Sequence, residues 1–362
     1  MINSIKPSTD QPILDHSHNH SKYLLAVTLV GAILLTMTWV AGYITKSAVD
    51  VRLSEFFNRQ ADQIANTYYN KIHTQVTIIE GVRGLWNSSN NFTSQRFTSY
   101  LSSLDFSNLD NSGASSYFYI PAVKHEDISK FEKKIQQEPT ISSVYQNFAI
   151  NPASDIPVHY PATYTYPLEG REKSIGLDFG TFPERLDAIT YAKESGKLAT
   201  TKAVILQTTG RPGFFFILPL YYNAQSLDLP SDRDQQFAGV VGAAFRSSSA
   251  FEQIFGGSDP YPYLDFQIYQ GEAITPDRLL HDHDGNFEDL HPRYSTTRVV
   301  RYQGQTWTIN VQSKPSFALR DPEQNLPYIV FISGILSTPI LIITSLVGYF
   351  RHLRNAKSGH NA

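Results

Sequence analysis

The stretch "SIGLDFGTFPERLDAITYAKESGKLATTKAVILQTTGRPGFFFILPLYY", residues 174–222, places a helix directly before two apolar runs. Thr181 and Glu184 have the spacing of a capping box, and Gly196 supplies the left-handed residue with which many helices end. The two apolar runs after Gly196 are separated by a turn that contains Gly and Pro, so they are expected to form a hairpin. The stretch therefore predicts antiparallel strands with a helix beside them, which is the pattern of an α+β fold.

The rest of the region between residues 91 and 318 continues this mixture of strands and short helices, including a second hairpin turned at Gly304. The elements lack the regular alternation of a parallel sheet, so antiparallel sheets flanked by helices are expected. Residues 91–236 and 237–318 have similar content, which predicts two related subdomains. The run "GVVGAAF", residues 239–245, is expected to be the strand that opens the second one.

Two long apolar runs frame this region, at residues 23–43 and 326–350. Each run is free of charged side chains and long enough to cross the roughly 30 Å of hydrocarbon in a bilayer as a helix. Both are therefore predicted to be transmembrane helices.

Basic residues indicate how these spans are oriented. Three of them directly follow the second run, and the positive-inside rule places such residues in the cytoplasm. Two spans put both ends of the chain on one side, so the tails 1–22 and 351–362 are predicted to be cytoplasmic and residues 44–325 external. The sequence predicts a two-pass protein of the cytoplasmic (inner or plasma) membrane.

Residues 44–80 contain no Gly or Pro, so the first span is expected to continue outward as a stalk helix over residues 44–90. Apolar residues recur along it at spacings of four and three, which places them on one face. This apolar seam either lies on the core of its own domain or pairs with a second copy, giving a homodimer through the stalk. The seam consists of Leu53, Phe57, Ala61, Ile64, Tyr68, Ile72, Val76 and Ile79.

Composition excludes several classes of function. The formal net charge is −3 and there is no long basic block, so nucleic-acid binding has no electrostatic support. The chain has no cysteine, which rules out disulfides, thiolate metal sites and cysteine nucleophiles. It also lacks the common hydrolase, zinc-protease, P-loop and dinucleotide motifs. The sequence therefore predicts a protein that is not an enzyme and uses no metal or cofactor.

Asp178 is the carboxylate whose role the opening stretch leaves open. It follows an apolar pair and precedes the helix, so it lies near the mouth of any cleft between sheet and helix. An isolated Asp in such a position commonly accepts hydrogen bonds in a turn. A ligand contact on the outside of the membrane is the alternative, and a catalytic acid would need partners that the sequence does not supply.

The opening stretch resembles the CHASE domain, the extracytoplasmic sensor of membrane histidine kinases and nucleotide cyclases, over about 50 residues, and weaker agreement extends roughly from Ala65 to Ser316. The chain departs from the family pattern at Arg171, Leu186 and Ile128. The matching marks are Gly176, Asp178, Pro183, Arg185, Ala188, Ala192, Gly196, Thr201, Gly213, Phe214, Pro219, Leu220 and Tyr221.

The resemblance implies a long N-terminal helix carrying two PAS-like subdomains, of which the membrane-distal one, residues 91–236, holds a small-molecule ligand. Cytokinin-binding members use the position of Asp178 to contact the ligand, with the position of Thr201 nearby. Phe214 or Phe216 is then expected to supply an apolar wall, and Arg185 is the fifth expected ligand contact.

Members of this family pass their signal to an output domain, and only about a dozen residues follow the second span. The expected output is therefore a separate histidine kinase or nucleotide cyclase, unless the sequence is a fragment. The alternative to a ligand sensor is an external scaffold that binds another envelope component.

Overall fold

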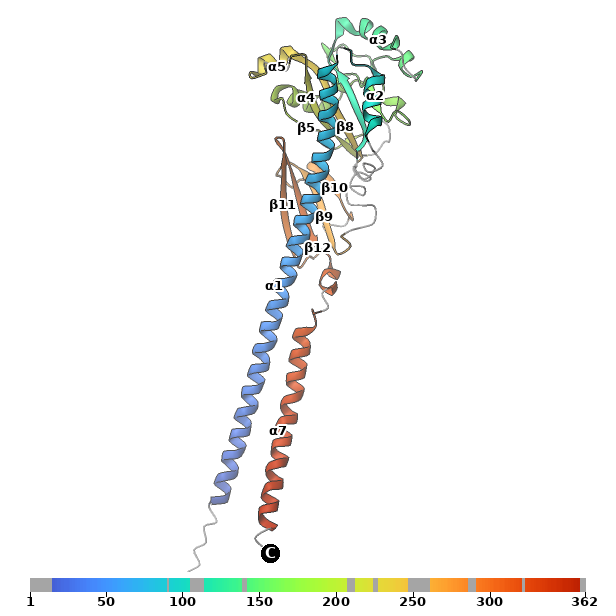
Figure 1. Cartoon of the computed structure of the whole chain (residues 1–362). Helices are drawn as coiled ribbons and strands as arrows, with labels where there is room; N and C mark the ends of the chain where they lie inside the picture. The colour runs from blue at the N-terminus through green and yellow to red at the C-terminus, as the bar shows by residue number, and fades with distance from the viewer. Residues whose placement is uncertain are drawn as a thin grey trace, which may run out of the picture. The chain divides into compact units, whose positions relative to one another are not determined.

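The computed structural model divides the chain into two compact units, Met1–Phe56 with Ala318–Ala362, and Phe57–Phe317. Helix α1 (Asp15–Ser88) contributes to both units. Figure 1 shows the elements in chain order. The residues that the structure describes are 15–89, 91–104, 114–138, 142–206, 212–223, 227–246, 261–285, 291–320 and 323–358.

The first unit contains the N-terminal part of α1 and helix α7 (Leu326–Ser358). Both helices are long and apolar enough to cross a membrane, and the predicted spans lie within them. The rings of Tyr23 and Tyr349 stack with centroids 3.8 Å apart, and the Tyr23 hydroxyl lies 2.8 Å from the Ser345 hydroxyl. These contacts pair the two helices side by side within this unit.

In the second unit, the apolar seam of α1 is buried by the chain's own domain. Every seam residue from Phe57 to Ile79 is at most 2% exposed. Tyr68 meets the ring of Trp307 at 6.0 Å, and Phe57 meets Phe317 at 5.8 Å. Of the two arrangements predicted for this face, packing on its own core is the one found. A homodimer through the stalk stays a prediction, and it would have to use another face of α1.

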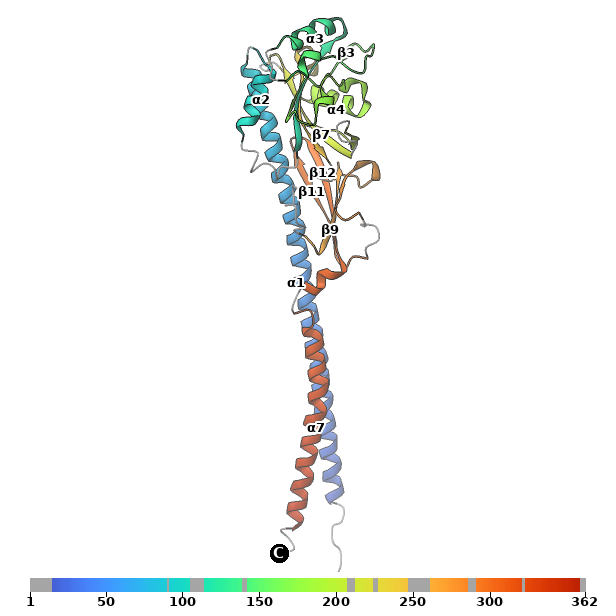
Figure 2. The same ribbon diagram turned by 90° about the vertical axis from the view of Figure 1, so that its right-hand side faces the viewer.

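A four-stranded antiparallel sheet packs on the part of α1 nearer to Phe57 (Figure 2). Its strand order is β10-β9-β12-β11, and β11 and β12 form the predicted hairpin at Gly304, where φ is +85°. Trp307 of β12 is fully buried where this sheet meets α1 and the other sheet, with Phe216 at 5.8 Å. The strands are β9 (Leu264–Gln270), β10 (Leu279–Asp282), β11 (Ser295–Tyr302) and β12 (Gln305–Ser313).

The six-stranded sheet has the order β4-β1-β8-β7-β5, with β6 paired to β7. Strand β8, expected to open the second subdomain, pairs instead with β1 and β7 at the centre of this sheet. Gly242 of β8 permits this close packing, because a Cβ there would lie 2.5 Å from the Phe118 ring. The strands are β1 (Ala114–Pro121), β4 (Tyr164–Tyr166), β5 (Ala199–Thr200), β6 (Val204–Ile205), β7 (Pro212–Tyr221) and β8 (Phe237–Arg246).

Alternate residues of this sheet face opposite sides, as the pleat of a strand requires. Tyr117 faces α1 and donates a 2.8 Å hydrogen bond to the Gln75 side chain. Phe118 and Phe215 face the other side, where they form one apolar cluster with Ile189 of helix α4 (Pro183–Ser195). The six-stranded sheet thus separates α1 from α4.

Helix α4 ends as predicted but begins differently. Gly196 is its C-cap in the left-handed conformation, with φ of +72°. The predicted capping box does not form, because Phe182 is the N-cap and makes no side-chain cap bond. Thr181 instead belongs to a short 3₁₀ turn, η5 (Phe179–Thr181), and its hydroxyl donates to the Asp178 carbonyl at 2.8 Å.

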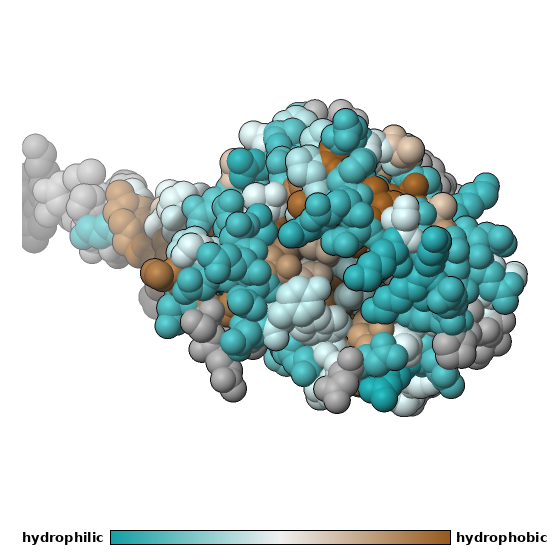
Figure 3. Space-filling model, turned by 90° about the horizontal axis from the view of Figure 1, so that it is seen from above, coloured by the Kyte–Doolittle hydropathy of each residue, from teal (hydrophilic) through white to brown (hydrophobic). Residues whose placement is uncertain are grey.

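The face of the molecule seen in Figure 3 is mostly hydrophilic, with hydrophobic side chains in small separate areas.

The remaining described elements are short. They are α2 (Ser94–Ser103), β2 (Val123–Lys124), η2 (His125–Asp127), α3 (Ile128–Gln136), η3 (Tyr145–Asn147), β3 (Val158–His159), η4 (Glu172–Ser174), α5 (Pro230–Gln236), η6 (Pro276–Arg278) and η8 (Pro315–Arg320).

Candidate ligand-binding site

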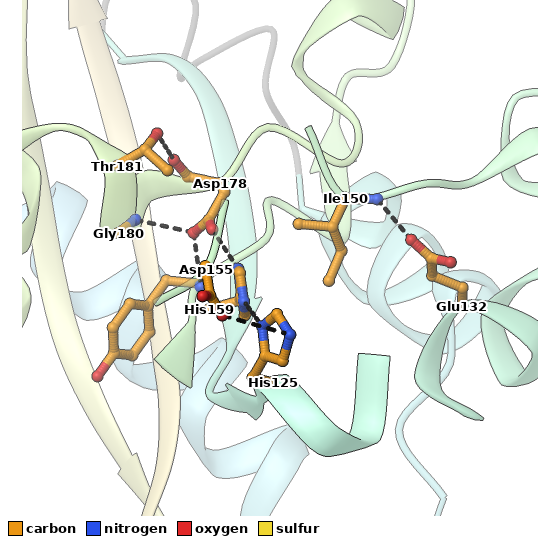
Figure 4. Close-up of polar contacts among 9 residues, drawn as sticks. His125, Glu132, Ile150, Asp155, His159, Asp178, Gly180 and Thr181 are labelled. Atoms are coloured by element: carbon orange, nitrogen blue, oxygen red, sulfur yellow. Dashed lines mark hydrogen bonds and ion pairs between the residues drawn. The ribbon is translucent and has the colours of Figure 1, made fainter. Parts of the chain in front are cut away.

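Asp178 lies at the start of the 3₁₀ turn before α4, fully buried, and its carboxylate is surrounded by donors (Figure 4). One oxygen accepts hydrogen bonds from the backbone N–H groups of Tyr160 at 2.8 Å and Gly180 at 2.9 Å. The other lies 2.7 Å from Nδ1 of His159, which is also fully buried. The carboxylate therefore ties strand β3 to the turn before α4.

The His159 ring continues this chain of contacts toward the surface. Its Nε2 lies 3.2 Å from Nδ1 of His125, whose side chain is half exposed. His125 Nε2 lies 3.8 Å from the exposed carboxylate of Asp155. A buried carboxylate paired with a histidine is also found in catalytic triads, but such a triad needs a nucleophile beside the histidine. Here the neighbour is a second histidine, so the geometry favours a structural link.

A cleft opens on the α4 side of the six-stranded sheet, and we call it the sheet cleft. It encloses about 480 Å³ when the solvent at its mouth is counted, of which about 40 Å³ has room for water-sized molecules. Its walls are Ser115, Ser116, Phe118, Ala162, Thr165, Arg171, Ser174, Leu177, Phe179, Arg185, Leu206, Phe215 and Ala244. Two arginines, four hydroxyl side chains and an apolar floor thus line it, and no acidic residue is among these lining residues.

Arg185 of α4 is the most unusual residue of the sheet cleft, because it is charged and only 2% exposed. Its guanidinium carbon lies 4.1 Å from the centre of the Phe182 ring, 4.6 Å from Phe179 and 5.4 Å from Phe215. These cation–π contacts offset part of the cost of burial. Burial nevertheless lowers the pKa of Arg185 to about 10.

The hydrogen-bonding groups of Arg185 are poorly satisfied. Nη2 reaches the Ile205 carbonyl only at 3.5 Å, and the buried Nη1 has no hydrogen-bond partner among the residues that the structure describes. Within those residues, no carboxylate forms an ion pair with this guanidinium. A buried donor without an acceptor costs about 1–3 kcal/mol, and more when it is charged.

The other four expected ligand contacts do not line the sheet cleft. Phe214 and Phe216 lie on the opposite face of the sheet, where Phe214 stacks on Phe245 at 4.9 Å. The hydroxyl of Thr201 accepts a 3.0 Å hydrogen bond from the backbone N–H of Phe215. Thr201 lines a separate hollow, together with Gln270. Asp178 is occupied by the donors described above. Arg185 is thus the expected contact that the structure places in the sheet cleft.

A comparison with protein-family models identifies the domain: the CHASE domain model matches residues 90–281, more than half of the chain. The chain belongs to the CHASE domain family. The match includes the six-stranded sheet, α4 and the whole sheet cleft. No curated protein matches the sequence.

The chain also shows weak similarity to solved structures, with TM-scores below 0.5, and these include sensor domains of bacterial chemoreceptors. The periplasmic sensory domain of the Campylobacter jejuni chemoreceptor Tlp1 has a TM-score of 0.44 and 11% identity, covering 75% of this chain and 98% of its own. The ligand-binding domain of the Pseudomonas fluorescens chemoreceptor CtaA, in complex with L-leucine, has a TM-score of 0.42 and 13% identity, with coverage of 75% and 98%. The ligand-binding domain of the Pseudomonas aeruginosa chemoreceptor PctB, in complex with L-Gln, has a TM-score of 0.41 and 12% identity, covering 74% of this chain and 95% of its own.

CHASE domains are extracytoplasmic sensors, and the two apolar helices α1 and α7 flank this one in the sequence. The chain therefore carries an extracytoplasmic ligand-binding sensor domain between two candidate membrane helices. Within the described residues, no group of three or more His, Asp or Glu side chains is placed to hold a metal ion.

Sequence reasoning missed several residues that build the site of this CHASE domain. Phe215, rather than its two neighbours, faces the sheet cleft, and His159 pairs with Asp178 from 19 residues away. Arg171 is noted in the sequence only as a departure from the family pattern, yet it lines the cleft. Nothing in the local sequence sets Arg185 apart as a buried charge, because Glu184 precedes it directly and Asp187 follows two residues later.

Proposed function

We propose that this protein is a two-pass membrane sensor whose external domain binds a small molecule in the sheet cleft and passes the signal across the membrane. Residues 44–325 lie outside and both termini lie in the cytoplasm. The two sheets form two PAS-like subdomains, the one with the sheet cleft being membrane-distal. The receiver is a separate histidine kinase or nucleotide cyclase, and the protein itself has no catalytic role.

The observation that carries this proposal is the sheet cleft itself, a hollow with apolar walls and a few converging polar groups inside the region matched to a sensor family. Ligand pockets commonly have this composition. The room inside is small, so a ligand has to be small or α4 has to move away from the sheet as it enters. A scaffold that binds another envelope component gives no reason for a buried cation in such a hollow.

The route toward the membrane begins in strand β1. Ser116 and Phe118 line the sheet cleft, whereas Tyr117 between them is hydrogen-bonded to Gln75 of α1. A ligand that displaces β1 therefore displaces a strand bonded to α1, which runs without interruption from Asp15 to Ser88. The ligand biases this helix only by as much as it binds the two arrangements with different affinity.

The expected contacts of Asp178, Thr201, Phe214 and Phe216 with the ligand remain proposals. For Asp178, a ligand contact would require His159 or a backbone donor to give up its place on the carboxylate. Arg185 needs no such rearrangement.

The test is a thermal-shift screen of the full chain in lipid nanodiscs against purines, amino acids and small acids. We expect at least one compound to raise the apparent Tm in a saturable way, and Ala244→Phe, which fills the sheet cleft, to remove the response. Circular dichroism checks that the variant is folded. A response that survives in folded Ala244→Phe places the ligand elsewhere and contradicts the proposal.

A further inference from the structure

The sheet cleft contains a buried guanidinium that forms no ion pair with a carboxylate of the described residues, and this indicates the class of ligand. Arg185 is buried, its guanidinium carbon lies 4.1 to 5.4 Å from the centres of three aromatic rings, and Arg171 lines the same cleft. The adjacent Glu184 attracts this charge but is not ion-paired with it. Among the described lining residues there is no Asp or Glu. A buried guanidinium without an ion-pair partner lowers the stability of the domain, because removing a charge from water costs several kcal/mol unless a partner is supplied.

We propose that the ligand carries a carboxylate, which binds the guanidinium of Arg185 inside the sheet cleft. This deepens the proposed function and rests on it. The three rings lie near the guanidinium, and Nη1, which has no partner among the described residues, is the donor that the carboxylate satisfies. The planar fork of a guanidinium matches the two oxygens of a carboxylate, and such bonds are roughly twice as strong as neutral ones.

The neighbouring groups fit the rest of a small acid. Phe118, Phe215 and Leu206 provide an apolar wall, and hydroxyls such as that of Thr165 offer further hydrogen bonds within the same cleft. Thr165 is 4% exposed, and its hydroxyl lies 3.4 Å from that of Ser174, at the long limit of a hydrogen bond. A cationic ligand would meet two arginines in this wall and no acidic lining residue, so like-charge repulsion disfavours it.

The experiment uses the full chain in nanodiscs and two acid–amide pairs of nearly equal shape: acetate with acetamide, and benzoate with benzamide. Inorganic phosphate is the third kind of probe, and sodium chloride holds the ionic strength constant. We expect at least one acid to raise the apparent Tm with an affinity at least about tenfold above that of its amide, as a charge-assisted hydrogen bond predicts. Phosphate is expected to bind more weakly than that acid.

Three variants test whether Arg185 is the cause. Arg185→Met should abolish the response to acids while leaving the apparent Tm without acid unchanged or raised, since the buried charge without an ion-pair partner is gone. Arg185→Lys should keep a weakened response, because it keeps the charge and loses the fork. Arg278→Met removes an exposed guanidinium outside the sheet cleft and is the matched control, with a response equal to that of the parent.

The outcomes separate this inference from the proposed function. If amides bind as well as acids and Ala244→Phe removes both responses, the cleft binds ligands but the charge inference is wrong. If neither acid shifts the parent, or if Arg185→Met responds like the parent, the inference is overturned. Stronger binding of phosphate than of either acid overturns the choice of a carboxylate.

Discussion

Replacing Asp178 by Ala should destabilise the external domain strongly, because two buried polar groups and one half-buried group depend on its carboxylate. These are the N–H groups of Tyr160 and Gly180 and the ring of His159, at 2.8, 2.9 and 2.7 Å. Each buried group left without a partner costs about 1–3 kcal/mol, so the loss is about 3 kcal/mol or more. In a domain of this size each kcal/mol lowers Tm by about 2–4 °C, which predicts a fall of about 6–12 °C.

The Asn variant sharpens this prediction. Its side-chain oxygen can keep the two backbone bonds of Asp178, and its amide can donate to Nδ1 of His159 if that ring takes the other tautomer. Asp178→Asn should therefore cost clearly less than Asp178→Ala, about 1–2 kcal/mol. The assay is the apparent Tm of the full chain in nanodiscs without ligand. A fall of less than about 2 °C in Asp178→Ala would refute the structural role and favour the role of ligand contact.

Three further predictions concern other parts of the second unit. Gly242→Ala should lower the free energy of unfolding, measured in denaturant, by about 2 kcal/mol or more, because its Cβ would lie 2.1 Å from a backbone oxygen. The matched control is Gly84→Ala in α1, whose Cβ would meet nothing within 4 Å. It should raise the free energy of unfolding by up to about 1 kcal/mol. Burial lowers the pKa of His281 to about 3, so the folded protein binds fewer protons than the unfolded chain and loses stability as pH falls from about 6.5 toward 3. The variant His281→Phe should therefore lose less stability over this pH range, as measured by Tm at a series of pH values. An unchanged dependence of Tm on pH would contradict this prediction. A double-mutant cycle of Tyr117→Phe and Gln75→Leu should show a coupling of about 1 kcal/mol, and strict additivity would argue against the link between β1 and α1.

Local patterns in the sequence were sufficient for the buried face of α1 and for the C-terminal end of α4, though not for the start of α4. The seam of α1 and the Gly196 end of α4 follow local patterns of apolar spacing and backbone preference, and the structure confirms both. The hairpin at Gly304 is equally local. The apolar spacing and the glycines that determine these elements lie within a few residues of each element, so they can be recognised in a single sequence.

The sheet cleft depends on information that local patterns lack. Strand β7 is apolar on both faces, so alternation could not show that Phe215, and not Phe214 or Phe216, faces the cleft. The partners of β8 come from segments distant in the sequence, and its own residues do not specify them. The pairing of His159 with Asp178 is likewise a tertiary contact. Arg185 was expected as a contact through family resemblance, but only the structure shows that it is buried without an ion-pair partner among the described residues.

Trp307 gives this protein an optical reporter without any label. The chain has three tryptophans, and this one is fully buried where α1, β7 and β12 meet, with no hydrogen-bond partner for its indole N–H among the described residues. Indole fluorescence responds to the polarity around the ring, so a dry site of this kind emits at short wavelength. A rearrangement that opens the junction of the two sheets would shift that emission to the red, and Trp307→Phe supplies the blank for stopped-flow measurements of how fast the sensor responds.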